Sequence, residues 1–409
     1  MRSEYFRPIA PAVILLALLA LWMAIQSIPL PPSIWNTLPE RAAIVEIGEL
    51  AGLAESWRPI TLSPQRTLNS LASLVVPITA LLLLSMLSRE GVRQTVNTVV
   101  WIGVASAILG MAQIALPNSE GFYFYDITNA DSAVGLFSNR NHNALFLNLA
   151  LLFTMYMRPS PEVNRKDRKQ FGAIVIAAQA LLVIGILINA SRFGLLLLAA
   201  IGAIYIIRSI AALGRDRARG RSTRKHIVMM VCAGAAVIIV TGILAFANRI
   251  PAIERFLGQG LAEDQRAEVL PYVVELAQSY FPLGAGFGAF EQAYRNVEPD
   301  EFLSPRYLNH AHNDWAQVLL EGGLPVILIL LAALILLARY GFAIFARRKE
   351  EGADIALPTL GMLSLAMIAL HSAFDYPLRT PSIMLMAILS CALILLPAAG
   401  GGIKRLRSE

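Results

Sequence analysis

The residues with the clearest capacity for chemistry lie together in the segment NHAHNDW, 309–315. Two of the chain's five histidines, His310 and His312, stand there one residue apart, directly in front of a long apolar run. A neutral imidazole with a pKa near 6.5 can accept a proton, so either histidine could act as a general base. If the chain is extended before Asp314, and Asp314 caps a helix that starts at Trp315, both rings face one cavity.

Two other interpretations of the histidines stay open. Either ring could hydrogen-bond the loop backbone and have a structural role only. The pair could also bind zinc, but HxH lacks the partner motif HExxH of a zinc enzyme. The chain's two cysteines, Cys232 and Cys391, lie inside apolar runs, as small buried hydrophobic residues do. The sequence therefore favours a general base, and it predicts no metal ligands and no cofactor.

The composition places this segment in a membrane protein. Hydrophobic residues make up 56% of the 409 residues and charged residues only 15%, against roughly 25% charged in a soluble domain. Apolar stretches of about 20 residues, enough to cross a hydrocarbon layer of ~30 Å, recur along the whole chain. The first of them is too long for a cleavable signal peptide, so we expect it to be retained. These features predict an all-α, polytopic helical membrane protein.

The apolar runs predict about ten membrane helices, or twelve to fourteen if broken and interfacial helices are counted. We expect a single integral membrane domain over 1–409. A long external loop covers 248–313, and a shorter one covers 31–67, where RAAIVEIGELAGLAESW could form an amphipathic helix at the interface. The ten spans are expected at 8–30, 68–88, 95–116, 141–157, 171–190, 193–213, 227–247, 315–338, 356–374 and 380–397.

The basic residues orient these spans. One side of the membrane receives every lysine and most of the 34 lysines and arginines, including the basic loops 158–170 and 214–225. The other side carries only arginine and most of the 28 acidic residues. Basic loops stay in the cytoplasm, so the sequence predicts both termini inside and the histidines outside. The net charge of +6 is thus explained by the basic cytoplasmic loops that orient the membrane helices, and no nucleic-acid partner is expected.

Four external arginines have distinctive surroundings: Arg140, Arg192, Arg266 and Arg379. Arginine keeps its charge at any pH and contacts phosphate with a planar, bidentate fork. For each alone, an interfacial anchor or a structural ion pair is the alternative. Arg192 lies between two apolar runs of about 20 residues each, and an ionisable residue in such a position indicates function.

The long external loop has a recognisable internal pattern. A helix is expected around Arg266 to Tyr280, followed by the run GAGFG, in which Gly284, Gly286 and Gly288 alternate with other residues. Without a preceding strand this run is no dinucleotide fingerprint. It predicts a turn where the backbone passes close to other backbone or to a ligand.

Taken in order, these motifs resemble the O-antigen ligase and Wzy-type polymerase superfamily, which are membrane glycosyltransferases of bacterial surface polysaccharide assembly. The resemblance extends from about Gly135 to Pro381 and is most specific in the histidine segment. Its motifs are FSNRNHNA (137–144), ASRFGLL (190–196), PLGAGFGAFEQAY (282–294), NHAHNDWAQVLLEGGLP (309–325) and HSAFDYPLRTP (371–381).

The resemblance implies a GT-C-like, metal-independent, inverting glycosyltransferase whose active site faces the periplasm. The donor would be a glycan carried on undecaprenyl diphosphate, which also suits a compartment without nucleotide sugars. By the same resemblance Arg192 and Arg266 bind the diphosphate in place of Mg²⁺. His310 or His312 would deprotonate an acceptor hydroxyl, and the sequence does not select between them.

Further substrate-binding residues follow from the resemblance. The candidates that line the glycan or lipid-phosphate path are Asn139, Arg140, Asn141 and His142, together with Asn313 and Arg379. One departure concerns the segment EDQRAEVLPYVVELA, which lacks the aromatic residue that many family members carry shortly after the arginine. If Arg266 is misaligned, Arg255 or Arg249 takes its place.

Three functions remain in competition. A polymerase would join lipid-linked repeat units into an O-antigen or exopolysaccharide, and a ligase would move a finished glycan onto lipid A–core. An anion or glycolipid transporter would use the arginines as a selectivity funnel. We expect the bacterial inner membrane as location. The expected partners are the undecaprenyl-diphosphate-linked donor, a glycan or glycolipid acceptor, the bilayer and a chain-length regulator.

Overall fold

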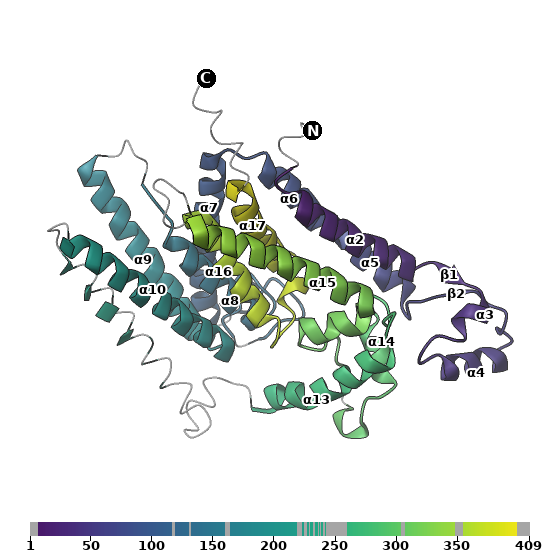
Figure 1. Cartoon of the computed structure of the whole chain (residues 1–409). Coiled ribbons are helices and arrows are strands. Elements are labelled where there is room, and N and C mark those ends of the chain that lie inside the picture. Colours follow the sequence, from purple (N-terminus) through teal and green to yellow (C-terminus); the bar gives the residue numbers. More distant parts are fainter. Residues whose placement is uncertain are drawn as a thin grey trace. The chain divides into compact units, whose positions relative to one another are not determined.

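The computed structural model (Figure 1) describes residues 7–398, apart from 117–118, 131, 160–163, 219–222, 304–306, 348–354 and most of 225–259. The predicted span 227–247 therefore lies largely outside the described residues. The chain divides into two compact units. Unit 1 comprises Met1–Ser88 and Leu261–Glu409, and unit 2 comprises Arg89–Gly260.

Unit 1 joins both ends of the chain and contains the histidine segment. Within it α2 lies along α15, and α17 packs against α6 and α16. Its helices are α2 (Ala10–Gln26), α3 (Pro32–Trp35), α4 (Ala42–Leu50), α5 (Pro64–Ser73), α6 (Val75–Ser85), α13 (Gly260–Ser279), α14 (Phe290–Arg295), η2 (Asp300–Phe302), α15 (Asp314–Arg347), α16 (Ala356–His371), η3 (Pro377–Arg379) and α17 (Pro381–Ala398).

Unit 2 is a bundle around one buried helix. Its elements are α7 (Arg89–Ala115), η1 (Ser119–Phe122), α8 (Arg140–Thr154), α9 (Arg165–Asn189) and α10 (Arg192–Ala218). Every residue of α8 is buried, because α7, α9 and α10 all pack against it. The polar residues of α8 therefore face the bundle interior, where polar side chains of membrane helices normally lie.

The fold is that of an all-α polytopic membrane protein, as the composition predicts. Among the described residues five helices are long and apolar enough to cross a membrane: Pro64–Ser85, Arg89–Ala115, Lys166–Asn189, Arg192–Gly214 and Asp314–Arg347. Three shorter apolar helices, α2, α16 and α17, accompany them. The described strands, β1 (Pro29–Leu30) and β2 (Arg58–Pro59), form one short antiparallel pair.

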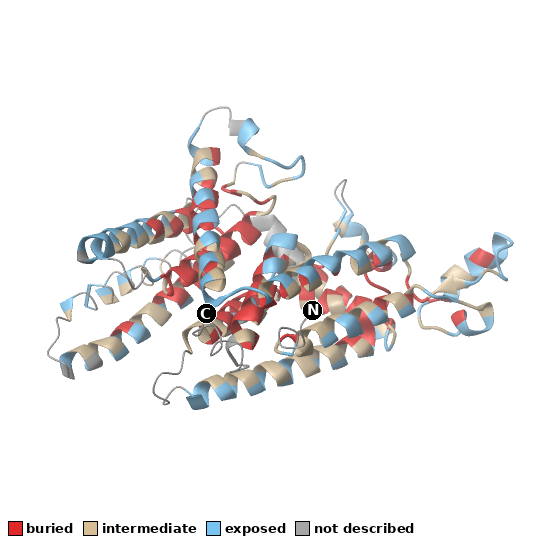
Figure 2. Cartoon of the chain, turned by 90° about the horizontal axis from the view of Figure 1, so that it is seen from above, coloured by how far each residue is buried: buried red, intermediate tan, exposed pale blue. Residues whose placement is uncertain are grey.

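The long helices expose apolar side chains, as lipid-facing helices must. Along α15 the exposed residues include Leu328, Leu331, Leu334 and Phe342, and buried residues concentrate in the interior of each unit (Figure 2). In water such a surface would be costly, whereas lipid tails are as apolar as leucine. The exposed apolar surface of α15 therefore agrees with a membrane location.

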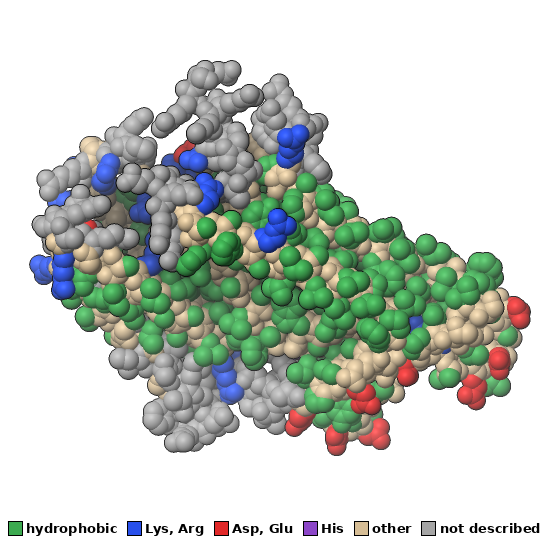
Figure 3. Space-filling view, in the orientation of Figure 1, with side chains coloured by type: hydrophobic (Ala, Val, Ile, Leu, Met, Phe, Trp, Pro, Cys, Tyr) green, Lys and Arg blue, Asp and Glu red, His purple; other side chains and the backbone are tan. Residues whose placement is uncertain are grey.

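Charge separates along unit 1 in the way that the predicted orientation requires. Acidic side chains gather over α4 and near α14 (Figure 3), both in segments predicted to be external. Arg339 and Arg347 instead lie in the C-terminal half of α15. The orientation itself stays a prediction.

Helix α15 is broken near its N-terminus. Gly323 has φ 60° and ψ −152°, which no helix contains, and Pro325 follows it. The amide of Leu324 donates to the carbonyl of Pro282 at 2.8 Å instead of to its own helix. A broken helix is tolerated in a membrane protein because neighbouring segments satisfy the freed backbone groups.

The glycine run of the long loop forms hydrogen bonds with some of the backbone groups that the break in α15 frees. Gly284, Gly286 and Gly288 all have positive φ, and the amide of Gly286 donates to the carbonyl of Glu321 at 3.0 Å. A Cβ on Gly284 would lie 2.6 Å from that same carbonyl oxygen. The prediction that backbone passes close to other backbone here is confirmed, and α15 provides the other backbone.

Helix α2 completes the support of the break. The indole of Trp22 donates to the carbonyl of Gly322 at 2.8 Å, and the amide of Gln26 donates to the carbonyl of Glu321 at 2.9 Å. The first membrane helix thus holds the first turns of α15, which carry the candidate site, in a fixed position.

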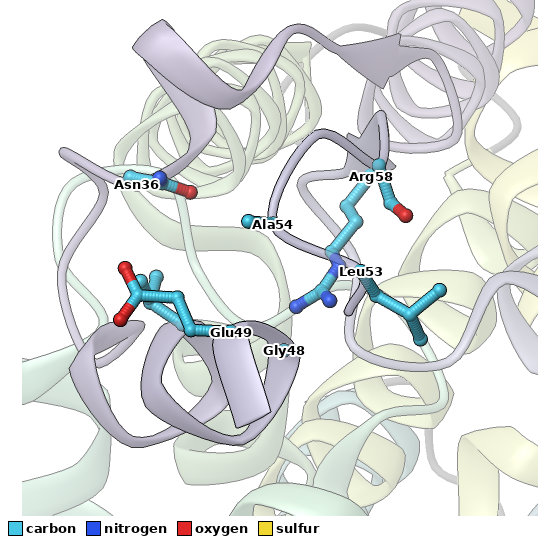
Figure 4. Close-up of a pocket in the computed structure, with 8 residues that line it drawn as sticks. Asn36, Gly48, Glu49, Leu53, Ala54 and Arg58 are labelled. Carbon is cyan, nitrogen blue, oxygen red and sulfur yellow. The ribbon is translucent and has the colours of Figure 1, made fainter. Parts of the chain in front are cut away.

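The segment between α2 and α5 forms a small cap rather than one long interfacial helix. Helix α4 ends at Leu50, and Gly52 then adopts φ 72°. Figure 4 shows a hollow in this cap into which Arg58 points, between Asn36 and Glu49. The guanidinium of Arg58 donates to the carbonyl of Ile44 at 3.2 Å, and it therefore ties β2 to α4.

Candidate active site

The two histidines project from a turn that is anchored by the residue between them. Ala311 is buried in a core with Phe290, Tyr294 and Leu320, and its amide donates to Oε1 of Gln317 at 3.0 Å. The rings on either side of Ala311 both contact Tyr376, with centroids 4.4 Å away for His310 and 4.9 Å away for His312. Both rings therefore contact the same tyrosine, but φ of His312 is 49°, so the segment is not extended as predicted. That both rings face one cavity stays a prediction.

His312 is paired with a buried carboxylate. Its Nδ1 lies 3.1 Å from Oδ1 of Asp375, whose side chain is 1% exposed, while the imidazole is 14% exposed. A carboxylate oxygen only accepts hydrogen bonds, so in the neutral ring the proton is on Nδ1 and Nε2 has the lone pair. This is the arrangement in which a histidine can take a proton through Nε2.

His310 has the opposite tautomer. The carboxamide oxygen of Gln317 already accepts from Ala311, so its NH₂ group is the donor to Oε1 of Glu321 at 2.9 Å and to Nδ1 of His310 at 3.4 Å. Nδ1 of His310 therefore accepts, and in the neutral ring Nε2 carries the proton. The two imidazoles thus differ: His312 can accept through Nε2, and His310 can donate through Nε2.

The surroundings of His310 also keep its ring neutral. The pKa of His310 is lowered to about 3, mainly because the buried imidazolium loses its hydration and also because Arg379 is positively charged, against a smaller opposing effect of Asp375. A group with so low a pKa is a weak base. The geometry therefore favours His312 over His310 as the proton acceptor.

Arg379 holds two buried carboxylates beside the turn. Its guanidinium contacts Oε2 of Glu321 at 3.0 Å and Oδ1 of Asp314 at 3.4 Å. Asp314 also accepts from the hydroxyl of Ser372 at 3.1 Å and from the amide of Leu378 at 3.2 Å. Arg379 thus joins η3 to α15, and its predicted contact with substrate would use the part of the side chain that stays exposed.

The cap of α15 differs from the prediction. The helix begins at Asp314, and the side chain that accepts from its first turn is Asn313, from the amide of Ala316 at 3.0 Å. The expectation that Asp314 caps the helix is wrong, because its carboxylate is held by Arg379 and Ser372. The amide of Asn313 donates to the carbonyl of Ala373 at 3.0 Å, so this predicted substrate ligand also has a structural role.

In unit 2 the predicted residues of FSNRNHNA form the N-terminus of α8. Asn139 is the N-cap, and its side chain accepts from the amide of Asn141 at 2.8 Å. Arg140, Asn141 and His142 follow in the first turn and are buried. The amide of Arg140 donates to the side chain of Asn129 at 3.0 Å.

The junction between α9 and α10 lies beside this N-terminus. Asn189 donates to the carbonyls of Ala133 at 2.8 Å and Arg140 at 2.9 Å, and it thereby connects the start of α8 to the end of α9. Arg192 is the first residue of α10, and the hydroxyl of Ser191 accepts from the amide of Gly194 at 3.2 Å. Arg192 thus stands at a helix N-terminus between two spans, where backbone amides favour anions.

The predicted site residues therefore form two groups. His310, His312, Asn313 and Arg379 meet in unit 1. Arg140, Arg192 and their neighbours meet in unit 2, and the convergence of the two groups on one pocket stays a prediction. Arg266 lies on α13, as expected for the helix of the long loop, but its side chain is outside the described part of the structure, as are Arg249 and Arg255.

The sequence did not single out Gln317, Glu321 or Asp375 as members of the site. Asp314, Gln317 and Glu321 are spaced i, i+3 and i+7 in an otherwise apolar segment, which puts them on one helix face. That pattern could have revealed Gln317 and Glu321. Asp375 is 63 residues from His312, and no local spacing indicates their contact.

Across the described residues, no group of three or more His, Cys, Asp or Glu side chains is arranged to hold a metal ion. The cluster around Tyr376 contains histidines and carboxylates, but they are paired with one another and with Arg379. It can orient a proton acceptor and hold neighbouring groups in fixed protonation states.

The apolar helices and this buried His–Asp pair define a polytopic membrane protein with a candidate acid–base site next to a membrane helix. Residues 177–331 match the family model Wzy_C, described as O-antigen ligase. That segment contains Arg192, Arg266, His310 and His312. The match confirms the resemblance to the O-antigen ligase and Wzy superfamily and supports a membrane glycosyltransferase of the ligase or polymerase type. A search of curated proteins found no match.

Proposed function

We propose that this protein is a Wzy-type polysaccharide polymerase. It transfers a glycan from undecaprenyl diphosphate to a sugar hydroxyl of an acceptor, at the periplasmic face of the bacterial inner membrane. The observation that carries the proposal is the pairing of His312 with buried Asp375, within a turn that belongs to the segment matched by the O-antigen ligase family.

His312 acts as the general base. Its Nε2 takes the proton of the acceptor hydroxyl as the oxygen attacks the anomeric carbon of the donor, and Asp375 stabilises the imidazolium that forms. The bond between the anomeric carbon and the diphosphate oxygen breaks on the opposite face, so the configuration inverts. His310, with its proton on Nε2, can donate to a sugar oxygen and hold the acceptor.

Arg192 and Arg266 bind the leaving diphosphate. Charge develops on its oxygens as the sugar–oxygen bond breaks, and fixed positive groups stabilise that charge without a metal ion. Arg192 is supported in this role by its position at the N-terminus of α10, next to the N-terminus of α8 with Arg140. In this arrangement Asn139, Asn141 and His142 line the path of the lipid phosphate, and Asn313 and Arg379 flank the acceptor.

Two alternatives share part of this machinery. An O-antigen ligase would use the same base and the same leaving group but transfer a finished glycan to lipid A–core. A transporter of anions or glycolipids would use the arginines without a base. The buried carboxylate on His312 favours a transferase, since a binding funnel has no need to orient a proton acceptor.

Purified protein in lipid nanodiscs, supplied with a lipid-diphosphate glycan and an acceptor, tests the proposal. We expect release of undecaprenyl diphosphate, its loss in His312→Asn, and full release in the matched control His226→Asn, which the predicted topology puts on the cytoplasmic side. Turnover in EDTA tests metal independence. A ladder of glycan lengths would indicate a polymerase and one added block a ligase, while no release from the wild-type protein would refute both.

A further inference from the structure

Two arginines, Arg66 of α5 and Arg295 of α14, share one carboxylate, that of Glu291. The side chain of Glu291 is 7% exposed. It contacts Arg66 at 2.5 Å and also Arg295, and these two arginine side chains are 43% and 57% exposed. A guanidinium has five N–H donors, and one carboxylate satisfies only part of them on each arginine. Buried Glu291 holds both guanidinium groups, so their remaining N–H donors have fixed positions at the surface.

An exposed tyrosine lies beside this pair. The guanidinium of Arg295 stands 5.4 Å from the ring centroid of Tyr307, and Tyr307 is 59% exposed. Val297 and Leu303, in the same stretch of the loop, are also exposed. The surface thus combines an exposed aromatic ring with fixed N–H donors. Arg295 and Tyr307 lie outside the candidate membrane spans, whereas Arg66 lies in the first turn of one, Pro64–Ser85.

The same helix has polar atoms that nothing in the described part of the protein satisfies. The carboxamide oxygen of Gln292 and the hydroxyl of Tyr294 are buried, and each is without a hydrogen-bond partner there. Buried polar groups are nearly always hydrogen-bonded, so such atoms indicate a water or a ligand hydroxyl. Both residues belong to α14, the helix that also carries Arg295.

The residues beneath this surface belong to the same hydrophobic core as the turn that carries the candidate base. The ring of Phe290 stacks on that of Tyr294, with centroids 5.6 Å apart, and both belong to the core that contains Ala311. Tyr307 precedes His310 by three residues, which limits their separation along the chain to about 10 Å. A ligand at Tyr307 is therefore within the length of a short oligosaccharide of the histidine turn.

We propose that Arg66, Arg295 and Tyr307 form a saccharide-binding subsite for the acceptor glycan. A pyranose has apolar C–H faces that pack on an aromatic ring, and hydroxyls that both donate and accept hydrogen bonds. The ring of Tyr307 and the fixed guanidinium donors match these groups. The inference rests on the proposed function, because the acceptor is the substrate whose hydroxyl must reach His312.

Kinetics with Tyr307→Ala and Arg295→Ala test the subsite. We expect KM for the acceptor to rise at least tenfold, while kcat and the KM of the lipid-diphosphate donor stay within twofold of wild type. Tyr307→Phe keeps the ring and should keep the acceptor KM. Tyr125→Ala, which removes an exposed tyrosine of unit 2, is the matched control and should leave all constants unchanged. Unchanged acceptor KM in both alanine variants would overturn the subsite and leave the proposed function intact.

A binding measurement decides the matter without catalysis. In the variant His312→Asn/Tyr307→Trp, the new indole reports on the surface, and the probe is an oligosaccharide cut from the surface polysaccharide of the producing bacterium. We expect a saturable change in fluorescence that Arg295→Ala abolishes. If the change appears only on reconstitution into anionic vesicles and not with saccharide, the surface contacts lipid and the proposal is wrong. If the wild-type protein releases no undecaprenyl diphosphate, the proposed function is wrong. The fluorescence measurement still shows whether this surface binds saccharide.

Discussion

The histidine turn of unit 1 and the α9–α10 junction of unit 2 are both rich in polar side chains, but these side chains find different partners. In the turn, ionisable side chains pair with side chains: His312 with Asp375, and Glu321 with Gln317 and Arg379. Asn313 and Asp314 of the same turn also bind backbone groups. In the junction, Asn189 binds backbone carbonyls and Ser191 binds a backbone amide.

The difference has a chemical meaning. A side chain that pairs with another side chain has its tautomer or charge state fixed, which is what proton transfer requires. A side chain that binds backbone fixes the position of a helix end, which is what the binding of an anion at helix N-termini requires. The turn is therefore suited to move a proton, and the junction is suited to hold a phosphate group.

The largest test of this comparison is removal of the base. His312→Asn should lower kcat by about 10³- to 10⁴-fold, because the acceptor hydroxyl loses its proton acceptor. The measurement is release of undecaprenyl diphosphate in single-turnover experiments, and binding of the donor should persist. If His312→Asn kept more than a tenth of the wild-type rate, His312 would not be the general base.

Removal of the junction's charge should have the next largest effect. Arg192→Ala should lower kcat by about 10²- to 10³-fold, the range for a lost group that stabilises developing negative charge. Arg192→Lys keeps the charge without the planar fork and should recover part of the rate. If both variants raised only the acceptor KM, the junction would contact the acceptor and not the diphosphate.

Asp375→Asn probes the side-chain pairing itself. The change should cost roughly 10- to 100-fold in kcat, as is common when a carboxylate that orients a histidine is removed. An asparagine can present either an oxygen or an NH₂ to Nδ1, so part of the molecules would hold the wrong tautomer. The pH profile of kcat should shift to lower pH, since the imidazolium loses a stabilising charge. A purely structural aspartate would change expression or melting temperature without moving this profile.

The sequence predicts those parts of the site that depend on local patterns. Apolar runs place the helices, and glycines at 284, 286 and 288 mark the close approach of backbone. Both rings of HAH contact Tyr376, but through a left-handed His312 and not through the extended segment that the spacing suggested. The cap of α15 is misplaced by one residue, because the carboxylate of Asp314 is held by Ser372, at the C-terminal end of α16, and by Arg379 of η3. The role of Asp375 is missed for the same reason, since contacts between distant turns leave no periodic signal in either segment.

Stability variants test how firmly the glycine run supports the turn. Gly284→Ala should lower the free energy of unfolding by about 2–4 kcal/mol, because it combines a positive φ with a collision of Cβ and the carbonyl of Glu321. Gly52→Ala is the matched control: its φ of 72° is similar, but nothing lies within 4 Å of the new Cβ. That control should cost about 1–2 kcal/mol. Equal losses, measured by denaturation in nanodiscs, would mean that the contact with α15 contributes nothing.

The last test concerns the effect of pH on His310. The pKa of His310 is lowered to about 3 in the folded protein, whereas an unfolded histidine has a pKa of about 6.5. Between these values the unfolded state binds the additional proton, so stability rises with pH, by at most about 1.4 kcal/mol per pH unit. His310→Gln removes this proton and should flatten the pH dependence of the melting temperature between about pH 4 and 6.5. His312→Gln is the matched comparison in the same turn. If His312→Gln flattened the curve and His310→Gln did not, the buried neutral ring would be His312, and the assignment of the base would pass to His310.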